Sequence, residues 1–167
     1  NYSFKDWSLL NIIYVGVYFV ENRNIINSII KVNELFEIKH DIYPNTKKNL
    51  YLSATRSNGI ILVDEASIVE QRSNISIENI FLTIKPLIKY FKINKRLLFK
   101  ENIIAPVIKQ TRDSIYQADL IIYSPGTQHS SLCPTYMTKN LGKIISNNKK
   151  AVKIFVTNIG ADYETPH

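Results

Sequence analysis

The sequence has few of the residues that cross-link or unstructure a chain. Cys133 is the only cysteine in 167 residues, so no disulfide can form within the chain, and a reducing compartment, the cytoplasm, is expected. Five glycines and six prolines are too few for a low-complexity chain. The N-terminal apolar run, residues 9–20, is broken by Asn11 and Gly16 and is too short to cross a bilayer. We therefore expect neither a signal peptide nor a membrane partner.

Acidic residues are scarce relative to basic ones. The 21 lysines and arginines outnumber the 14 aspartates and glutamates, which gives a net charge of +7 and favours anionic partners. No helix-turn-helix, zinc-finger or aromatic-basic RNA-binding pattern is present, so a phosphorylated small molecule or nucleotide is expected rather than a nucleic acid. The 45% of apolar residues is enough for one sizeable core, and the length fits one domain.

The spacing of apolar residues and the positions of turn residues predict a mixture of helices and strands. Helices are predicted over residues 9–19, 25–35, 109–117 and 136–146. Strands are predicted over residues 37–42, 51–56, 60–63, 80–84, 119–123 and 152–157, with an edge strand near 103–108 that Pro106 interrupts. Asn58-Gly59 is a strong hairpin signal. The final strand, helix and strand form a βαβ unit, so we predict an α/β fold, a Rossmann-like three-layer sandwich with a mainly parallel sheet.

A basic segment follows the strand predicted over residues 80–84. Its charged residues are Lys85, Lys89, Lys92, Lys95, Arg96 and Lys100, and no acidic residue occurs until Glu101. One interpretation is a surface that attracts anions, and the other is the solvated face of an excursion from the sheet. The sequence alone favours the solvated face.

A polar loop follows the apolar strand predicted over residues 119–123. Ligands in open α/β sheets bind just beyond the carboxyl ends of such strands. A glycine permits close approach of a ligand, and backbone N–H groups with hydroxyls suit an anion. The candidate ligand-binding or phosphate-binding residues of this loop are Ser124, Gly126, Thr127, Gln128, His129, Ser130 and Ser131. The alternative is an ordinary turn followed by a helix cap, since serine and threonine are the usual capping residues.

A second polar turn follows the strand predicted over residues 152–157. Asn158 stands in this turn, and the two turns should form one crevice because neighbouring parallel strands end at the same edge. Its side chain can bond a base, a sugar or a phosphate, or it can fix the turn. His129 can likewise act as a proton donor, contact a phosphate or be an ordinary loop histidine. We interpret Cys133 as a buried small residue rather than a nucleophile.

The segment ADLIIYSPGTQHSSLCP, followed by a helix and KIFVTNIGADYET, resembles a motif pair of the 2-phospho-L-lactate transferase (CofD-like) family, which includes the gluconeogenesis-factor (YvcK-like) proteins. Earlier segments agree in order, so that LLNIIYVGVYF places Asn11 beside the family's cleft and LSATRSNGIILVDEASI places Glu65. The resemblance spans roughly residues 8 to 165. The family's opening glycine-rich, phosphate-holding loop has no counterpart here. We therefore expect residues 1–167 to form a single domain that is the C-terminal part of a larger CofD-like domain.

The resemblance implies a protein that binds a phosphorylated nucleotide-type ligand at the strand ends. The family's namesake transfers a phospholactyl group from a guanosine diphosphate donor to a hydroxyl of a deazaflavin precursor, with magnesium. The gluconeogenesis-factor branch implies a non-catalytic, nucleotide-sugar-binding regulator instead, and a third alternative is that this segment alone is inactive. Glu65 and Asp162 are the candidate carboxylates for Mg²⁺, and no catalytic residue is assigned. The family also implies a homodimer, for which the apolar N-terminal helices are the expected interface.

Overall fold

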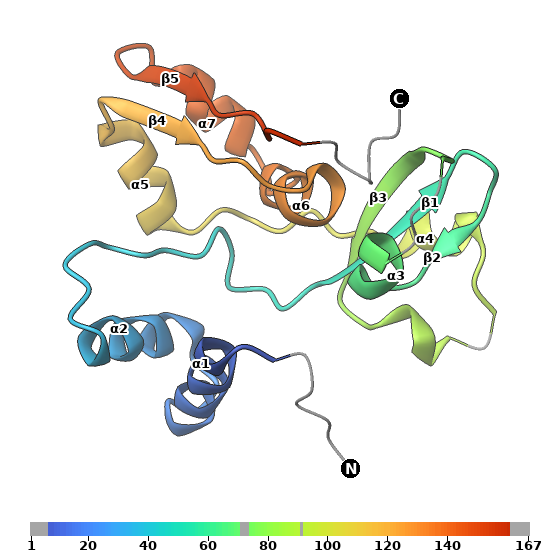
Figure 1. Cartoon of the computed structure of the whole chain (residues 1–167), viewed down its shortest axis with the longest axis horizontal. Helices are drawn as coiled ribbons and strands as arrows, with labels where there is room; N and C mark the ends of the chain where they lie inside the picture. Colours follow the sequence, from blue (N-terminus) through green and yellow to red (C-terminus); the bar gives the residue numbers. More distant parts are fainter. Residues whose placement is uncertain (1–6, 71–73, 91, 161–167) are drawn as a thin grey trace. The chain divides into compact units, whose positions relative to one another are not determined.

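The computed structural model describes residues 7–70, 74–90 and 92–160 (Figure 1). The chain divides into two compact units, residues 1–47 and 48–167, and each is described by itself. The described residues form both helices and strands, which confirms the predicted α/β class. None of the helices in these ranges is long and apolar enough to cross a membrane.

The N-terminal unit is a pair of packed helices whose ends are set by local side chains. Helix α1 (Leu9–Val20) begins where the hydroxyl of Ser8 accepts the N–H of Asn11 at 3.2 Å. Helix α2 (Ile25–Leu35) begins where Asn24 Oδ1 accepts the N–H groups of Ile26 and Asn27. These caps satisfy backbone donors that a helix start leaves unbonded. Both helices agree with the sequence prediction.

The strand predicted over residues 37–42 is absent. Glu37 adopts a left-handed φ of 53°, and the N–H of Ile38 bonds back to the carbonyl of Asn33 at 2.9 Å. This arrangement closes the C-terminus of α2 rather than starting a strand. The alternating apolar pattern predicted a strand, but no neighbouring strand among the described residues pairs with it, and Ile38 and Ile42 lie exposed.

The second unit contains a three-stranded antiparallel sheet of order β2-β1-β3. Strand β1 (Tyr51–Arg56) turns through Gly59, at φ 86°, into β2 (Ile61–Leu62), as the Asn-Gly signal predicts. Strand β3 (Ile77–Thr83) pairs with the other edge of β1. Ala54 of β1, Leu62 of β2 and Ile68 of α3 (Glu65–Glu70) form one core cluster.

The basic segment folds beside this sheet. It forms a 3-10 turn η1 (Leu87–Lys89) and helix α4 (Lys95–Glu101), which the sequence analysis did not predict. Leu98 of α4 is fully buried and clusters with Phe81 and Leu87, while Lys95 pairs with Glu78 at 2.8 Å. The helix is therefore amphipathic, with an apolar side in the core and a charged side in solvent.

A parallel βαβ element completes the second unit. Strands β4 (Leu120–Tyr123) and β5 (Val152–Phe155) pair in parallel, with Tyr123 opposite Phe155. Helices α5 (Lys109–Gln117) and α7 (Leu141–Asn147) pack against each other beside this pair (Figure 1). The parallel sheet has two strands among the described residues, so the parallel part is smaller than the sequence analysis expected.

Two predicted boundaries in this element are wrong. The helix predicted over 136–146 is divided into α6 (Cys133–Tyr136) and α7, because Asn140 adopts a left-handed φ of 64° between them. The edge strand predicted near 103–108 is reduced to a single parallel bridge between Pro106 and Lys139. Proline lacks the N–H that a longer ladder would need.

Asn148, at the end of α7, ties this element together. Its side chain is 4% exposed. Its Nδ2 donates to the carbonyls of Ile115 at 2.7 Å and Ala118 at 2.8 Å, and its Oδ1 accepts the N–H of Ala151 at 3.1 Å. One amide therefore joins the end of α5, the end of α7 and the start of β5.

Apolar side chains of the parallel pair face solvent. Val152, Ile154 and Phe155 of β5 are 61%, 44% and 60% exposed, and Leu120 and Ile122 of β4 are 49% and 57% exposed. Strands of parallel sheets are normally buried on both faces, which explains the apolar composition of these two.

Candidate functional site

The turns after β4 and β5 are in direct contact, as the sequence analysis predicted. The N–H of Gly126 donates to Asn158 Oδ1 at 3.1 Å, and Asn158 Nδ2 donates to the carbonyl of Gly126 at 2.9 Å. The Asn158 side chain therefore fixes the backbone of the other turn. The carboxyl ends of the two strands meet at one edge, where α/β sheets bind ligands.

Three hydroxyls cluster just after Gly126. Thr127 Oγ1 lies 2.6 Å from Ser130 Oγ and 2.7 Å from Ser131 Oγ. Residues 128–132 form a π-helical turn, η2 (Gln128–Leu132), whose Ser131 and Leu132 N–H groups both bond to the carbonyl of Thr127. Ser130 is buried and Ser131 is exposed. A hydroxyl can donate one hydrogen bond and accept others, so Ser131 can donate outward when Thr127 donates to it.

Gly126 lies close to this turn. A Cβ atom at Gly126 would come within 3.3 Å of Leu132 Cδ2 and 3.6 Å of Ser131 Cβ. Glycine therefore allows the turn of residues 128–132 to lie tightly over the end of β4.

The other predicted loop residues flank this cluster. Ser124 is exposed at the end of β4, His129 is half-buried in η2, and Gln128 Nε2 lies 3.4 Å from Cys133 Sγ. Cys133 is half-buried rather than buried. The structure thus brings the residues of the two turns together, and their binding to a ligand stays a prediction.

An aromatic group beside the loop was not predicted as part of the site. The Tyr123 ring lies 6.0 Å from the Tyr136 ring and 6.3 Å from the Phe155 ring, measured between centroids. Burial, with smaller effects of Tyr123 and Cys133, raises the pKa of Tyr136. The one sequence feature that could have indicated this group is Tyr123, the last residue of β4, which directly precedes the loop.

Of the two candidate metal ligands, Glu65 and Asp162, the structure describes only Glu65. Glu65 is exposed in the first turn of α3, and α3 packs against η2. Asp162 lies outside the described residues. Within those residues no three His, Cys, Asp or Glu side chains come together as a metal-binding group. Magnesium needs only one or two carboxylates when phosphate oxygens supply its other ligands, and Glu65 is the predicted carboxylate that lies among the described residues.

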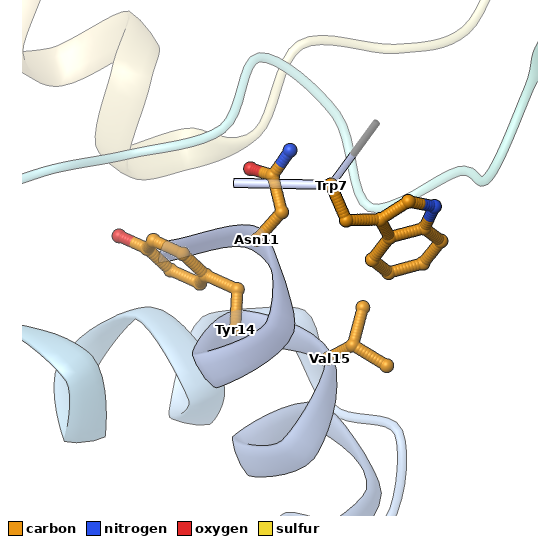
Figure 2. Close-up of a pocket in the computed structure, with 4 residues that line it drawn as sticks. All are labelled: Trp7, Asn11, Tyr14 and Val15. Atoms are coloured by element: carbon orange, nitrogen blue, oxygen red, sulfur yellow. The ribbon is translucent and has the colours of Figure 1, made fainter. Parts of the chain in front are cut away.

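Asn11 belongs to the N-terminal unit. It lines a pocket of about 400 Å³ with Trp7, Tyr14 and Val15. Figure 2 shows the Asn11 amide on α1 between the Tyr14 ring and the Trp7 ring.

Comparison with known proteins places the chain in a family. A family model described as "2-phospho-L-lactate transferase CofD" matches residues 3–166. The chain belongs to this family. Its membership confirms the resemblance that the two strand-end motifs predicted.

Relatives within the CofD family carry another description. Proteins described as "Putative gluconeogenesis factor" match from Clostridium acetobutylicum, 26% identical over 95% of this chain and 32% of its own length, and from Aquifex aeolicus, 25% identical over 95% and 44%. The chain thus spans less than half the length of these curated relatives.

Solved structures support the CofD-family fold. Two crystal structures of a UPF0052-family protein from Bacillus halodurans match with TM-scores of 0.69 and 0.71 at 19% identity. They cover 90% and 95% of this chain, which in turn covers 42% and 44% of theirs. At this identity the match shows the fold alone.

Proposed function

We propose that the turns at residues 124–131 and 158 bind a phosphorylated nucleotide-type ligand, and that the protein is a transferase of a phosphorus-containing group of the 2-phospho-L-lactate transferase type. The observation that carries the proposal is the pair of hydrogen bonds between Gly126 and Asn158, which joins both strand ends beneath the hydroxyl cluster. Strand ends of α/β sheets are the usual place for such ligands.

The residues of this site have separate roles in the proposal. Backbone N–H groups of η2 and the hydroxyl of Ser131 donate to phosphate oxygens, while the hydroxyl of Thr127 donates to Ser131. The Asn158 amide keeps the turn in place, so these donors are aimed before the ligand arrives. The rings of Tyr123 and Phe155 offer a flat surface to an aromatic part of the ligand.

Magnesium has a defined role in the proposed transfer. Glu65 would hold the ion from the start of α3, and the ion would offset the phosphate charge when bound. The chain's own residues position the phosphates for an incoming hydroxyl.

A second candidate function is a non-catalytic regulator that binds a nucleotide sugar. The description shared by the Clostridium acetobutylicum and Aquifex aeolicus relatives, over 95% of this chain, favours it. In this reading the same turns hold the diphosphate, and Asn158 and Thr127 keep their roles without a reacting hydroxyl.

A thermal-shift comparison tests the proposal. The protein is heated with GDP, GTP, UDP-N-acetylglucosamine or a deazaflavin, each with and without magnesium, because a ligand that prefers the folded state raises Tm. A magnesium-dependent rise with the guanine nucleotide or the deazaflavin supports the transferase. A rise with the uridine sugar alone supports the regulator.

Variants locate the binding. The double variant Thr127→Ala, Ser131→Ala should lose most of the rise, whereas Ser146→Ala, an exposed serine of α7, should keep it. An equal rise in all three proteins would place the ligand elsewhere and overturn the proposed site.

A further inference from the structure

A second cleft lies between helices α5 and α7, outside the residues of the proposed site. It has a volume of about 410 Å³. Arg112 and Tyr116 line it from α5, Lys139 lines it from the turn before α7, and Lys143 and Asn147 line it from α7. Arg112 and Tyr116 stand one helical turn apart, as do Lys143 and Asn147, so each helix presents one face to the cleft.

The cleft is strongly basic. Arg112, Lys139 and Lys143 contribute positive charge, and no aspartate or glutamate is among the described residues that line it. Asp113 lies next to Arg112 in the chain and accepts its Nε–H at 3.2 Å. That bond uses one of the five guanidinium N–H groups. Asp113 is also paired with Lys109 at 2.6 Å.

Neither lysine of the cleft has an acidic partner among the residues that the structure describes. Lys31, Lys95 and Lys150 differ in this respect, since they pair with Glu34, Glu78 and Asp119. The field of Lys139 and Lys143 is therefore directed at the cleft and at solvent.

The walls of the cleft are held in place. The Asn148 side chain joins the end of α7 to the end of α5 through its bonds to Ile115 and Ala118. The N–H of Lys139 donates to the carbonyl of Ala105 at 2.8 Å, which fixes the turn before α7. The buried Ile144 lines the cleft from α7. Cations on fixed backbone bind an anion with less ordering cost than cations on a mobile loop.

We propose that this cleft is a second anion site that binds a small polyanion of the di- or triphosphate class. Its volume falls within the range of small-molecule sites, about 300 to 1,000 Å³. Three cations match the charge of a di- or triphosphate, and arginine is suited to bidentate phosphate contacts. The Tyr116 ring, 43% exposed, adds a flat face for an attached base.

Isothermal titration calorimetry of the whole chain with inorganic pyrophosphate tests the site. Lys143→Gln and Arg112→Gln should each weaken binding about tenfold, because each removes one charge-assisted contact. Lys149→Gln removes the same charge from an exposed position that does not line the cleft, and it should leave the affinity unchanged. Pyrophosphate can also bind at the loop after β4, so these variants are measured in the Thr127→Ala, Ser131→Ala background, and the binding that remains in that background is assigned to the cleft.

Each other result contradicts the proposal. An equal loss in Lys149→Gln would mean diffuse charge attraction. Loss of all binding in the Thr127→Ala, Ser131→Ala background would place the pyrophosphate at the loop. Binding of a single-stranded oligonucleotide without binding of pyrophosphate would point to a nucleic-acid surface. Circular dichroism of Lys143→Gln, Arg112→Gln and Lys149→Gln checks that these variants fold. Failure here leaves the loop proposal intact, because the loop variants are measured separately.

Discussion

Asn158 and Gly126 stand 32 residues apart and exchange two hydrogen bonds. The Gly126 backbone N–H donates one, and the Asn158 side-chain amide donates the other. The bonds connect the ends of β4 and β5 through a single side chain. The turn after β4 is therefore held by a residue of the turn after β5, and the two turns are coupled.

Replacement of Asn158 should destabilise the protein and loosen the loop. Asn158→Ala removes both bonds, and we expect a loss of about 1 kcal/mol in the free energy of unfolding, because the pair is exposed. Asn158→Asp keeps an acceptor for the Gly126 N–H but places a carboxylate against the Gly126 carbonyl, so it should cost at least as much. Urea denaturation measures both, with Thr157→Ala as the neighbouring control. Equal stability of Asn158→Ala and Thr157→Ala would contradict the role of the pair.

Asn148 should matter more than Asn158. Asn148→Ala leaves the carbonyls of Ile115 and Ala118 and the N–H of Ala151 without their bonds in a buried setting. We expect a loss of about 3 kcal/mol. The control is Lys149→Ala, which changes an exposed neighbour. A loss for Asn148→Ala no larger than for Asn158→Ala would show that α5 and α7 do not depend on this amide.

Alanine should have opposite effects at two glycines. Gly59 adopts φ 86° in the hairpin, where alanine is strained, so Gly59→Ala should cost about 1 kcal/mol. Gly142 lies within α7, and a Cβ there meets nothing within 4 Å among the described residues. Gly142→Ala should therefore stabilise the protein by about 0.5 to 1 kcal/mol. Thermal unfolding followed by circular dichroism distinguishes the two signs, and equal signs would contradict the assigned backbone conformations.

The start of α3 should lose stability in acid. The Ser67 hydroxyl and then the Ser67 N–H lower the pKa of Asp64, and that N–H lies 2.8 Å from Asp64 Oδ1. Because the folded-state pKa is depressed, this contribution is complete above the unfolded value of about 3.9 and is lost as the pH falls through the folded pKa.

The matching experiment compares two variants across pH. Asp64→Ala should lose about 1 kcal/mol at pH 7 through loss of the cap, and its difference from the parent protein should shrink below about pH 4. Asp64→Asn keeps a capping oxygen without a titrating group, so this part of the acid dependence should disappear. A difference between Asp64→Ala and the parent that stays constant down to about pH 2 would contradict the assignment.

Local signals predicted most elements, and failures occurred where a distant partner decides. Ser8, Asn24 and Gly59 act within a few residues, so the ends of α1 and α2 and the first hairpin were predictable. Residues 37–42 have the pattern of a strand but no partner strand among the described residues. Helix α4 was not predicted because the basic residues of this segment indicated a solvated surface, whereas Leu98 of α4 is buried in the core.

The candidate site follows the same division. The contact between the two turns was predictable because parallel neighbouring strands end at one edge. The pair of hydrogen bonds between Asn158 and Gly126 was not predictable, since it depends on the exact path of each turn. The grouping of Tyr123, Tyr136 and Phe155 depends on the register of β4 with β5 and on the break at Asn140, which no local pattern specifies.

The solvent-facing side chains of β4 and β5 also govern how copies of the protein behave at high concentration. Each strand of this pair has one edge without a bonded neighbour among the described strands, and such edges are templates for strand addition by another molecule. The net charge of +7 opposes this through repulsion between molecules. Salt screens the repulsion but leaves the apolar surface in place, so the colloidal stability of the protein should fall as ionic strength rises.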